Sequence, residues 1–268
     1  MIIDFHTHCF PDKLAPRALE VLCQTAWYSE HFPCTNGTVA GTAACIAAAG
    51  IDRAVVCNIA TNAHQQFNVN SFAISIAERH GTLIPLGSLH PNGENKRAEL
   101  ERLRAAGIRG IKIHPDYVHF DIDCPDFDEV FSLCAEMGIF VITHAGLDPV
   151  SPNHIHATPR KIANVLHRHP GLKMVAAHMG GLCCADDVLE SLVGQDIYFD
   201  TSLSSIRSDE HDILLRILHE HRPDRLLFGT DTPWSFSREE LKFVYGAGLS
   251  PDLTEQILWR NATQLLGL

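Results

Sequence analysis

The chain has 268 residues, of which 46% are hydrophobic and 20% charged, and its formal net charge is −11 at pH 7. This length is close to the roughly 250 residues of a one-domain eight-stranded α/β barrel, and the composition is typical of a globular protein. Because nucleic-acid binders usually present a basic face to the phosphates, the negative charge argues against a nucleic-acid partner.

Eight short apolar runs alternate with helical patterns and predict parallel strands that are covered on both faces. The runs are 2–6, 53–59, 83–89, 108–114, 139–144, 173–178, 196–200 and 225–231. Helical spacing is found between them, for example in 94–106, 126–137, 158–169 and 184–193. Eight β/α units without a second compositional region predict one α/β domain over residues 1–268, a single (β/α)8 TIM barrel; an open doubly wound sheet is the alternative.

Several residue types mark the expected helix boundaries. Three glycines stand between a helical run and the following strand, where a left-handed residue closes a helix: Gly107, Gly138 and Gly171. Near the end of the chain, Ser237 with Glu240 predicts a capping box. Ser250 followed by Pro251 predicts a helix start.

The stretch from about residue 10 to residue 38 contains Trp27 and Tyr28 and no strong strand pattern. We predict that it is an inserted loop after the first strand. Long loops in compact domains are often functional, so this loop is expected near the active site.

Polar residues end five of the predicted strands: His6 and His8, Lys112 and His114, His144, His178, and Asp231. In parallel α/β folds the reacting groups gather at the carboxyl ends of the strands. His6 and His8 are two residues apart, so both face the same side and can chelate one ion. A third imidazole from His144 and a carboxylate from Asp231 would complete a ligand shell that leaves room for water.

Two other H-x-H pairs occur, at His154 with His156 and at His219 with His221. The first pair falls in a loop bounded by prolines, and the second falls at a helix end. We expect both pairs to be solvated surface histidines.

These motifs resemble the amidohydrolase superfamily. The similarity is greatest to its amidohydrolase-2 branch of small TIM-barrel metal-dependent hydrolases, which is related to aminocarboxymuconate-semialdehyde decarboxylase. It rests on IDFHTH at the start, GIKIHP at 110–115, THAG at 143–146, AHMGG at 177–181, GTDTPW at 229–234 and the closing RNATQLLGL.

The resemblance implies that His6, His8, His144 and Asp231 bind a divalent metal ion. It implies that His178 either binds a second ion or hydrogen-bonds the metal's water or the substrate. Zinc is the first expectation, while iron, manganese and cobalt suit the same ligands, and the number of ions is one or two.

Lys112 requires a separate explanation, because an ordinary lysine is a cation at neutral pH and repels a metal ion. In dihydroorotase-like members a similar lysine is carbamylated and becomes an anionic ligand. The alternatives are a substrate-binding ammonium and a structural ion pair. His114 lies on the same face of the strand and is a candidate ligand or substrate contact.

The expected function is hydrolysis of an amide, ester or lactone bond in a small molecule. A zinc-class ion lowers the pKa of its water from 15.7 to about 7, Asp231 would accept the proton, and His178 would stabilise the oxyanion. The alternative is non-oxidative decarboxylation of an aromatic or muconate-type acid, with Arg207 available for the substrate carboxylate. A second alternative is a non-catalytic barrel that binds metal and ligand.

The remaining expectations concern location and partners. The first residues lack a secretory signal, and no apolar run approaches the roughly 18 residues that cross a bilayer. The nine cysteines include no C-x-x-C pair, which indicates reduced thiols. We therefore expect a cytoplasmic protein with a small-molecule substrate and no membrane partner; a homodimer is an open alternative.

Overall fold

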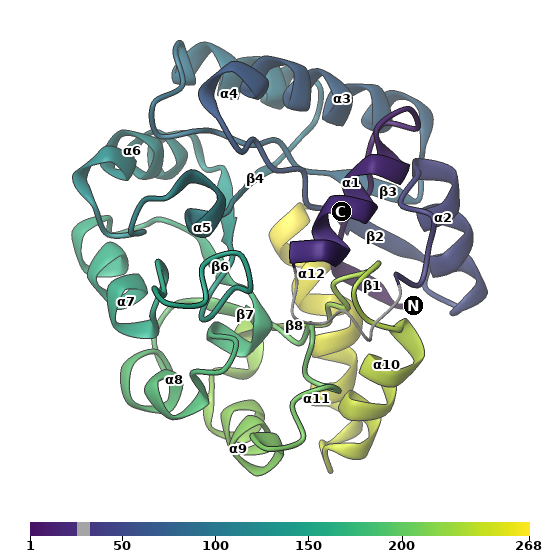
Figure 1. Cartoon of the computed structure of the whole chain (residues 1–268). Helices are drawn as coiled ribbons and strands as arrows, with labels where there is room; N and C mark the ends of the chain where they lie inside the picture. The colour runs from purple at the N-terminus through teal and green to yellow at the C-terminus, as the bar shows by residue number, and fades with distance from the viewer. Residues whose placement is uncertain (26–32) are drawn as a thin grey trace.

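The computed structural model describes residues 1–25 and 33–268, and its strands form a parallel ring surrounded by helices (Figure 1). The strands are β1 (Ile3–Thr7), β2 (Arg53–Val56), β3 (Leu83–Pro85), β4 (Gly110–Ile113), β5 (Phe140–Thr143), β6 (Met174–Ala176), β7 (Tyr198–Asp200) and β8 (Leu226–Leu227). Neighbours pair in parallel from β1 to β3 and from β4 to β8. Each strand lies within or overlaps a predicted run, and all but β1 are shorter. His6 and Lys112 lie within their strands, and His8, His114 and His144 directly follow theirs.

Two short seams close the ring. Between β3 and β4, Gly87 pairs with Ile111, and the Lys112 amide donates to the Gly87 carbonyl at 2.8 Å. Between β8 and β1, Thr7 pairs with Thr232, and the Phe5 amide donates to the carbonyl of Phe228, directly after β8, at 2.7 Å. The predicted TIM barrel is therefore confirmed, and the open doubly wound sheet is wrong.

The helices form the outer layer of the barrel (Figure 1). Those of the described residues are α1 (Ala15–Thr25), α2 (Val39–Ala48), α3 (Gln66–Arg79), α4 (Lys96–Ala105), α5 (Pro115–Val118), α6 (Asp128–Met137), α7 (Pro159–Arg168), α8 (Ala185–Ser191), α9 (His211–Glu220), α10 (Ser237–Gly246), α11 (Pro251–Glu255) and α12 (Asn261–Leu266). Gly107, Gly138 and Gly171 have φ values of 82°, 66° and 89°, so the predicted left-handed closing positions are confirmed.

One of the two predicted helix starts near the C-terminus is confirmed. The Ser250 hydroxyl accepts from the Leu253 amide, and Pro251 occupies the first turn of α11. The capping box of Ser237 with Glu240 is wrong, because α10 begins at Ser237 itself and its side chain caps nothing. Glu240 is buried and turned away toward the loops that follow β7 and β8, where its carboxylate accepts from serines.

The stretch from 10 to 38, predicted as a loop, contains helix α1. Trp27 and Tyr28 lie outside the described residues. In Figure 1, α1 lies across the mouth of the ring. The chain in this region therefore has regular structure and does not simply connect the first strand to α2.

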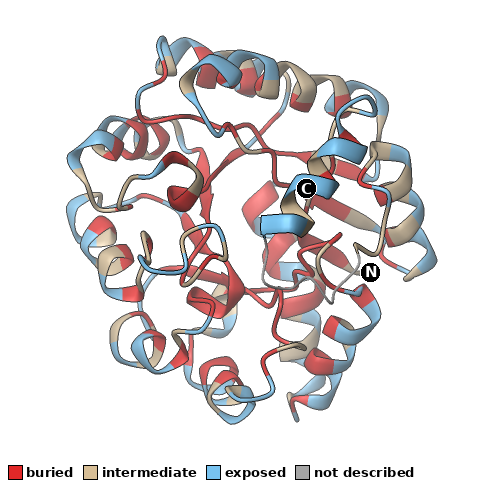
Figure 2. Cartoon of the chain, in the orientation of Figure 1, coloured by how far each residue is buried: buried red, intermediate tan, exposed pale blue. Residues whose placement is uncertain are grey.

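Burial follows the layers of the barrel (Figure 2). The strands are buried except at Arg53 and Ile84, which are partly buried, and the helices are buried on the face toward the strands and exposed on the other. The large core lies between strands and helices, while a smaller cluster joins residues such as Phe5 and Phe140 to Leu265 and Leu266 of α12. In the described part of the chain, no helix has both the length and the apolar character needed to span a bilayer.

Candidate functional site

A cavity of about 540 Å³ lies at the carboxyl ends of the strands. Its polar lining contains every residue that the sequence predicts as a metal ligand: His6, His8, Lys112, His144, His178 and Asp231. The rest of the lining is largely apolar and includes Phe10, Leu14, Leu22, Val69, Phe72, Ile206 and Trp234. Polar groups on the strand ends thus face a space enclosed mainly by hydrocarbon and aromatic side chains.

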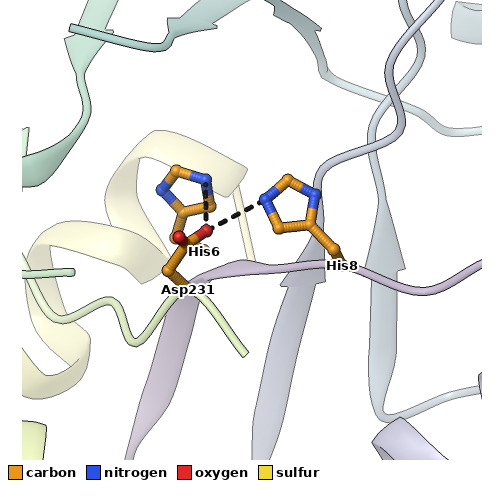
Figure 3. A group of neighbouring side chains, drawn as sticks. All are labelled: His6, His8 and Asp231. Carbon is orange, nitrogen blue, oxygen red and sulfur yellow. Dashed lines mark hydrogen bonds and ion pairs between the residues drawn. The ribbon is translucent and has the colours of Figure 1, made fainter. Parts of the chain in front are cut away.

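Three of these residues bring potential ligand atoms close together (Figure 3). Oδ1 of Asp231 lies 3.0 Å from Nε2 of His8 and 3.4 Å from Nε2 of His6. The three atoms all lie within 4.8 Å of one another. In a tetrahedral shell with ligand distances near 2.0–2.1 Å, neighbouring donor atoms are about 3.3 Å apart, so this spacing suits one cation.

The opposite nitrogens of both imidazoles have hydrogen-bond acceptors. Nδ1 of His6 lies 2.9 Å from Oδ2 of Asp200, and Nδ1 of His8 lies 2.9 Å from the carbonyl of Cys57. With a proton on each Nδ1, the two Nε2 lone pairs would be available to a cation that Asp231 also binds. Acceptors of this kind commonly orient the histidine ligands of metal ions.

The local electrostatics favour the protonation states that a metal ion requires. Burial and the charge of Lys112 hold the pKa of His6 well below its usual value. Burial alone would raise the pKa of Asp231, but His6 and His8 outweigh it, and the pKa of this carboxyl is lowered. Neutral imidazole and ionised carboxylate are the forms that ligate divalent cations, so this group fits such an ion.

His144 and His178 occupy the neighbouring part of the cavity. Nε2 of His178 lies 3.1 Å from Nδ1 of His144, and its other nitrogen lies 2.8 Å from the Ser202 hydroxyl. Burial lowers the pKa of His144 to about 4 and that of His178 well below its usual value. His144 does not join the close group of His6, His8 and Asp231; its Nε2 instead faces the Leu147 carbonyl at 3.3 Å.

Lys112 is almost completely buried and points toward the same centre. Its Nζ lies 3.1 Å from Nε2 of His6. It is 1% exposed, and among the lining residues of the described chain it is the one lysine or arginine. The structure therefore places the Lys112 amine beside the group of His6, His8 and Asp231, and carbamylation of Lys112 stays a prediction.

His114 lies in a separate polar group on the cavity wall. Its ring stacks between Tyr117 and His144, at centroid distances of 4.0 Å and 4.4 Å. Its Nε2 lies 3.4 Å from Oδ2 of Asp148, and its Nδ1 lies 3.7 Å from Oδ2 of Asp116. Burial would raise the pKa of Asp148, but the nearby His114 and His144 rings outweigh it and hold it well below its usual range.

Comparison with protein families decides the relationship that these residues suggest. The family model described as Amidohydrolase matches residues 3–268. This chain belongs to the amidohydrolase family. A search of curated proteins finds no match to it.

Solved structures similar to this amidohydrolase cover nearly the whole chain. An uncharacterised TIM-barrel protein from Bordetella bronchiseptica is 20% identical, with a TM-score of 0.77 and coverage of 99% of this chain and 98% of that one. The 5-carboxyvanillate decarboxylase from Novosphingobium aromaticivorans, complexed with manganese and 4-hydroxy-3-methoxy-5-nitrobenzoic acid, is 15% identical, with a TM-score of 0.74 and coverage of 100% and 96%. A dihydroxybenzoic acid decarboxylase from Polaromonas with bound manganese and 2-nitroresorcinol is 14% identical, with a TM-score of 0.71 and coverage of 100% and 97%. At these identities the similarity establishes the fold.

In the structure of this amidohydrolase, Arg207 contacts other protein groups and does not face the space where a substrate would bind. The guanidinium pairs with Glu210 at 2.7 Å and donates to the carbonyls of His178 and Gly181, both at 2.9 Å. Arg207 is not among the cavity-lining residues of the described chain. Its observed contacts hold the turn after β6, and a substrate carboxylate would have to displace them.

The secondary H-x-H pairs also differ from the prediction in two places. His221 is buried, stacks on Phe199 at 4.1 Å and lies 2.9 Å from the Ile197 carbonyl. His156 is half-buried and lies 3.1 Å from Asp116. Only His154 and His219 of the two pairs are exposed. The loop and the helix end both pack against the barrel, and this packing covers His156 and His221.

Sequence reasoning missed two carboxylates of this amidohydrolase. Asp200 ends β7, so the same strand-end argument that selected Asp231 would have found it. Asp148 lies four residues beyond His144 in a loop, where strand periodicity carries no signal. Asp148 becomes recognisable as a site residue only from its contacts with His114 and His144.

Proposed function

We propose that this amidohydrolase-family protein is a metal-dependent decarboxylase that removes carbon dioxide from a small aromatic or muconate-type acid. One observation carries the proposal: the buried Lys112 side chain stands beside the His6, His8 and Asp231 group in a cavity enclosed mainly by apolar residues. This arrangement suits a compact molecule that is anionic at one end and apolar elsewhere.

The apolar lining supports an aromatic substrate. Phe10, Phe72 and Trp234 offer flat surfaces, and aliphatic residues also line the cavity. Aromatic rings gain from burial against such residues and from offset or edge-to-face contact. A volume of about 540 Å³ is within the range of pockets that hold small ligands.

From the sequence we expected hydrolysis first. The comparisons instead favour decarboxylation. Two of the similar structures are decarboxylases of substituted benzoic acids, and both contain manganese. Hydrolysis of an amide, ester or lactone has no comparable support among them. The His6, His8 and Asp231 donors suit a divalent ion in either reaction, with manganese, zinc, iron and cobalt all compatible with nitrogen and oxygen ligands.

The reaction is balanced by one proton. The bond between a substrate carbon and its carboxylate carbon breaks, carbon dioxide leaves, and a proton takes the electron pair that stays on the substrate carbon. A divalent cation held by His6, His8 and Asp231 would neutralise and orient the negative charge of the substrate. The proton must come from a group that faces the cavity.

The protein residues have separate tasks in this scheme. The Lys112 ammonium binds the substrate carboxylate through a charge-assisted hydrogen bond. Asp231 takes up one proton from solvent at a carboxylate oxygen before the cavity fills and passes it to the carbon that loses carbon dioxide. His178 hydrogen-bonds the oxygen on which charge develops, and the apolar walls exclude water so that these interactions are strong.

The test is carbon dioxide release from a panel of benzoic and muconic acids by the metal-loaded protein. We expect turnover of at least one acid, and a loss of about 100-fold or more in Asp231→Asn, consistent with the loss of proton transfer. Asp126→Asn, an equivalent change at an exposed residue, is the control. Hydrolysis of amides, esters or lactones without carbon dioxide release would replace the proposal, and metal binding without turnover of any compound would indicate a binding protein.

A further inference from the structure

A second group of potential metal ligands lies on the rim of the barrel, outside the cavity. Asp121 follows α5, and His154 and His156 stand in the loop between β5 and α7. Potential ligand atoms of these three residues, which we call the rim group, all lie within 4.8 Å of one another. The residues that line the cavity in the described part of the chain include none of the three. The rim group is therefore separate from the ligands in the cavity.

Backbone hydrogen bonds hold together the two loops that carry the rim group. The Ile122 amide, next to Asp121, donates to the His156 carbonyl at 3.0 Å. Ala157, next to His156, pairs with Gly146 at the end of the preceding strand. The ligands are thus placed before any ion binds, and an ion would not have to bring separate segments together.

The two imidazoles of the rim group are oriented so that both can bind one ion. An imidazole binds a metal in the plane of its ring, so two rings stacked in parallel do not direct their lone pairs at one point. The His154 and His156 rings meet edge to face, with centroids 4.5 Å apart and an interplanar angle of 82°. The His114 and His144 rings on the cavity wall are instead stacked at 11°. Of these two pairs, the rim pair is the one suited to a shared ion.

A buried carboxylate orients one of these imidazoles. Asp116 is fully buried, and its Oδ1 accepts from the Ser151 hydroxyl and lies 3.1 Å from Nδ1 of His156. With the proton on Nδ1, the Nε2 lone pair of His156 is available to an ion. Among the described residues, Asp116 forms ion pairs only with His114 and His156, and its Oδ2 accepts no hydrogen bond. Because a buried carboxylate is costly without a cation nearby, its charge would stabilise an ion on His156.

Lys161 is the cation that competes with a metal ion at the rim group. Its Nζ lies 2.9 Å from Oδ1 of Asp121, and the same oxygen lies 2.7 Å from Nε2 of His154. Oδ2 of Asp121 accepts from no described residue, so an ion can bind this oxygen while Lys161 stays on Oδ1. Ion binding would replace the hydrogen bond between His154 and Asp121. The Lys161 charge opposes the ion, so its removal should strengthen binding.

We propose that Asp121, His154 and His156 bind a divalent transition-metal ion of their own, with zinc the best fit. Two imidazoles and one carboxylate form a common zinc site, in which water completes the tetrahedral shell. Magnesium and manganese prefer sites richer in oxygen, so the rim group should select zinc over both. The proposal does not depend on which reaction takes place in the cavity.

The experiment measures zinc content and affinity by competition with a chelating dye, after metal has been removed from the whole protein. We expect the wild type to bind a cavity ion and a rim ion, and the double variant His6→Ala/His8→Ala to bind the rim ion alone. In both backgrounds, His154→Ala should weaken the rim site by at least the roughly 10–100-fold that follows loss of a partner of a ligand histidine. His154 is exposed, so the variant should keep its melting temperature without zinc. His64→Ala, which removes another exposed imidazole, is the matched control.

Lys161→Met tests the same site in the opposite direction. We expect zinc to bind about two- to fivefold more tightly when the competing ammonium is removed, the size typical of an ion pair at the surface. A structural role of the rim group alone would not produce this gain. Weaker zinc binding in Lys161→Met would contradict the placement of the ion on Asp121 and overturn the inference.

The outcomes are independent of the proposed function. Zinc that is lost in His154→Ala and kept in His64→Ala supports the inference, even if no acid releases carbon dioxide. A wild type that binds the cavity ion alone, or a zinc affinity that is unchanged in His154→Ala, overturns the inference and leaves the proposed function standing.

Discussion

Replacing Asp200 by asparagine tests how the protein prepares His6 for a metal ion. In the wild type, Oδ2 of Asp200 lies 2.9 Å from Nδ1 of His6, and both side chains are buried. Oδ1 accepts from the backbone amides of His178 and Ser202, both at 3.1 Å. An asparagine oxygen would keep these two hydrogen bonds, which directs the amide nitrogen toward His6.

The consequence is a change of tautomer. An amide donor facing Nδ1 of His6 favours the form whose proton is on Nε2, and Nε2 is the nitrogen that faces Asp231. A metal ion would then have to displace a proton from its own ligand atom. Changes to the partners of ligand histidines usually cost 10–100-fold in metal affinity, and we expect a loss of this size for Asp200→Asn, or about 1.4–2.8 kcal/mol.

The assay is competition for manganese or zinc between the protein and a chelating dye, at one fixed pH. Nitrogen NMR of labelled histidine, recorded on metal-free protein, reports the tautomer of His6 directly. Asp126→Asn is the control for loss of a negative charge. A metal affinity within twofold of the wild type, together with an unchanged His6 tautomer, would refute the reasoning.

Three further predictions concern charge, pH and backbone. Lys112→Met should weaken benzoate binding about tenfold or more at unchanged metal content, because a charge partner is lost; calorimetry and elemental analysis check this, and a fall in metal content would indicate a carbamylated ligand instead. Burial raises the pKa of Glu240 to about 7. The native state therefore keeps this proton up to a higher pH than the unfolded chain does. As pH rises from about 4.5 to 7, ionisation of Glu240 should lower the free energy of unfolding by about 3 kcal/mol. Urea unfolding at both ends of this range should show that loss in the wild type and not in Glu240→Gln, and equal pH slopes would contradict it. Gly146→Ala should lower the free energy of unfolding by about 3 kcal/mol, since its Cβ would meet Leu182 in a left-handed position; an unchanged melting curve would contradict this.

The parts of the fold that were predictable from sequence are those that depend on local pattern. Continuous apolar runs identified every strand, because parallel strands buried on both faces need apolar residues at each position. His6, His8 and Asp231 were identifiable because they stand where such runs end. The left-handed glycines were identifiable because few other residues adopt that conformation without strain.

What remained hidden depends on contacts between distant segments. Ser237 with Glu240 matches a capping pattern, yet Glu240 hydrogen-bonds Ser205 and Ser235, and no local rule weighs those partners against the cap. Arg207 has the charge for a substrate contact, but carbonyls of another loop occupy its guanidinium. In each case a tertiary interaction outcompeted the one that sequence spacing suggested.

The seam between β8 and β1 joins the first and the last strand of the barrel. Asp231 and His8 are 223 residues apart, and the Asp231 amide donates to the His6 carbonyl at 2.7 Å. Contacts of such long sequence separation form late in folding, because closing a long loop costs conformational entropy first. An ion shared across this seam would bind only after the ring has closed, because its ligands come from both strands. Folding and metal uptake would then be thermodynamically linked.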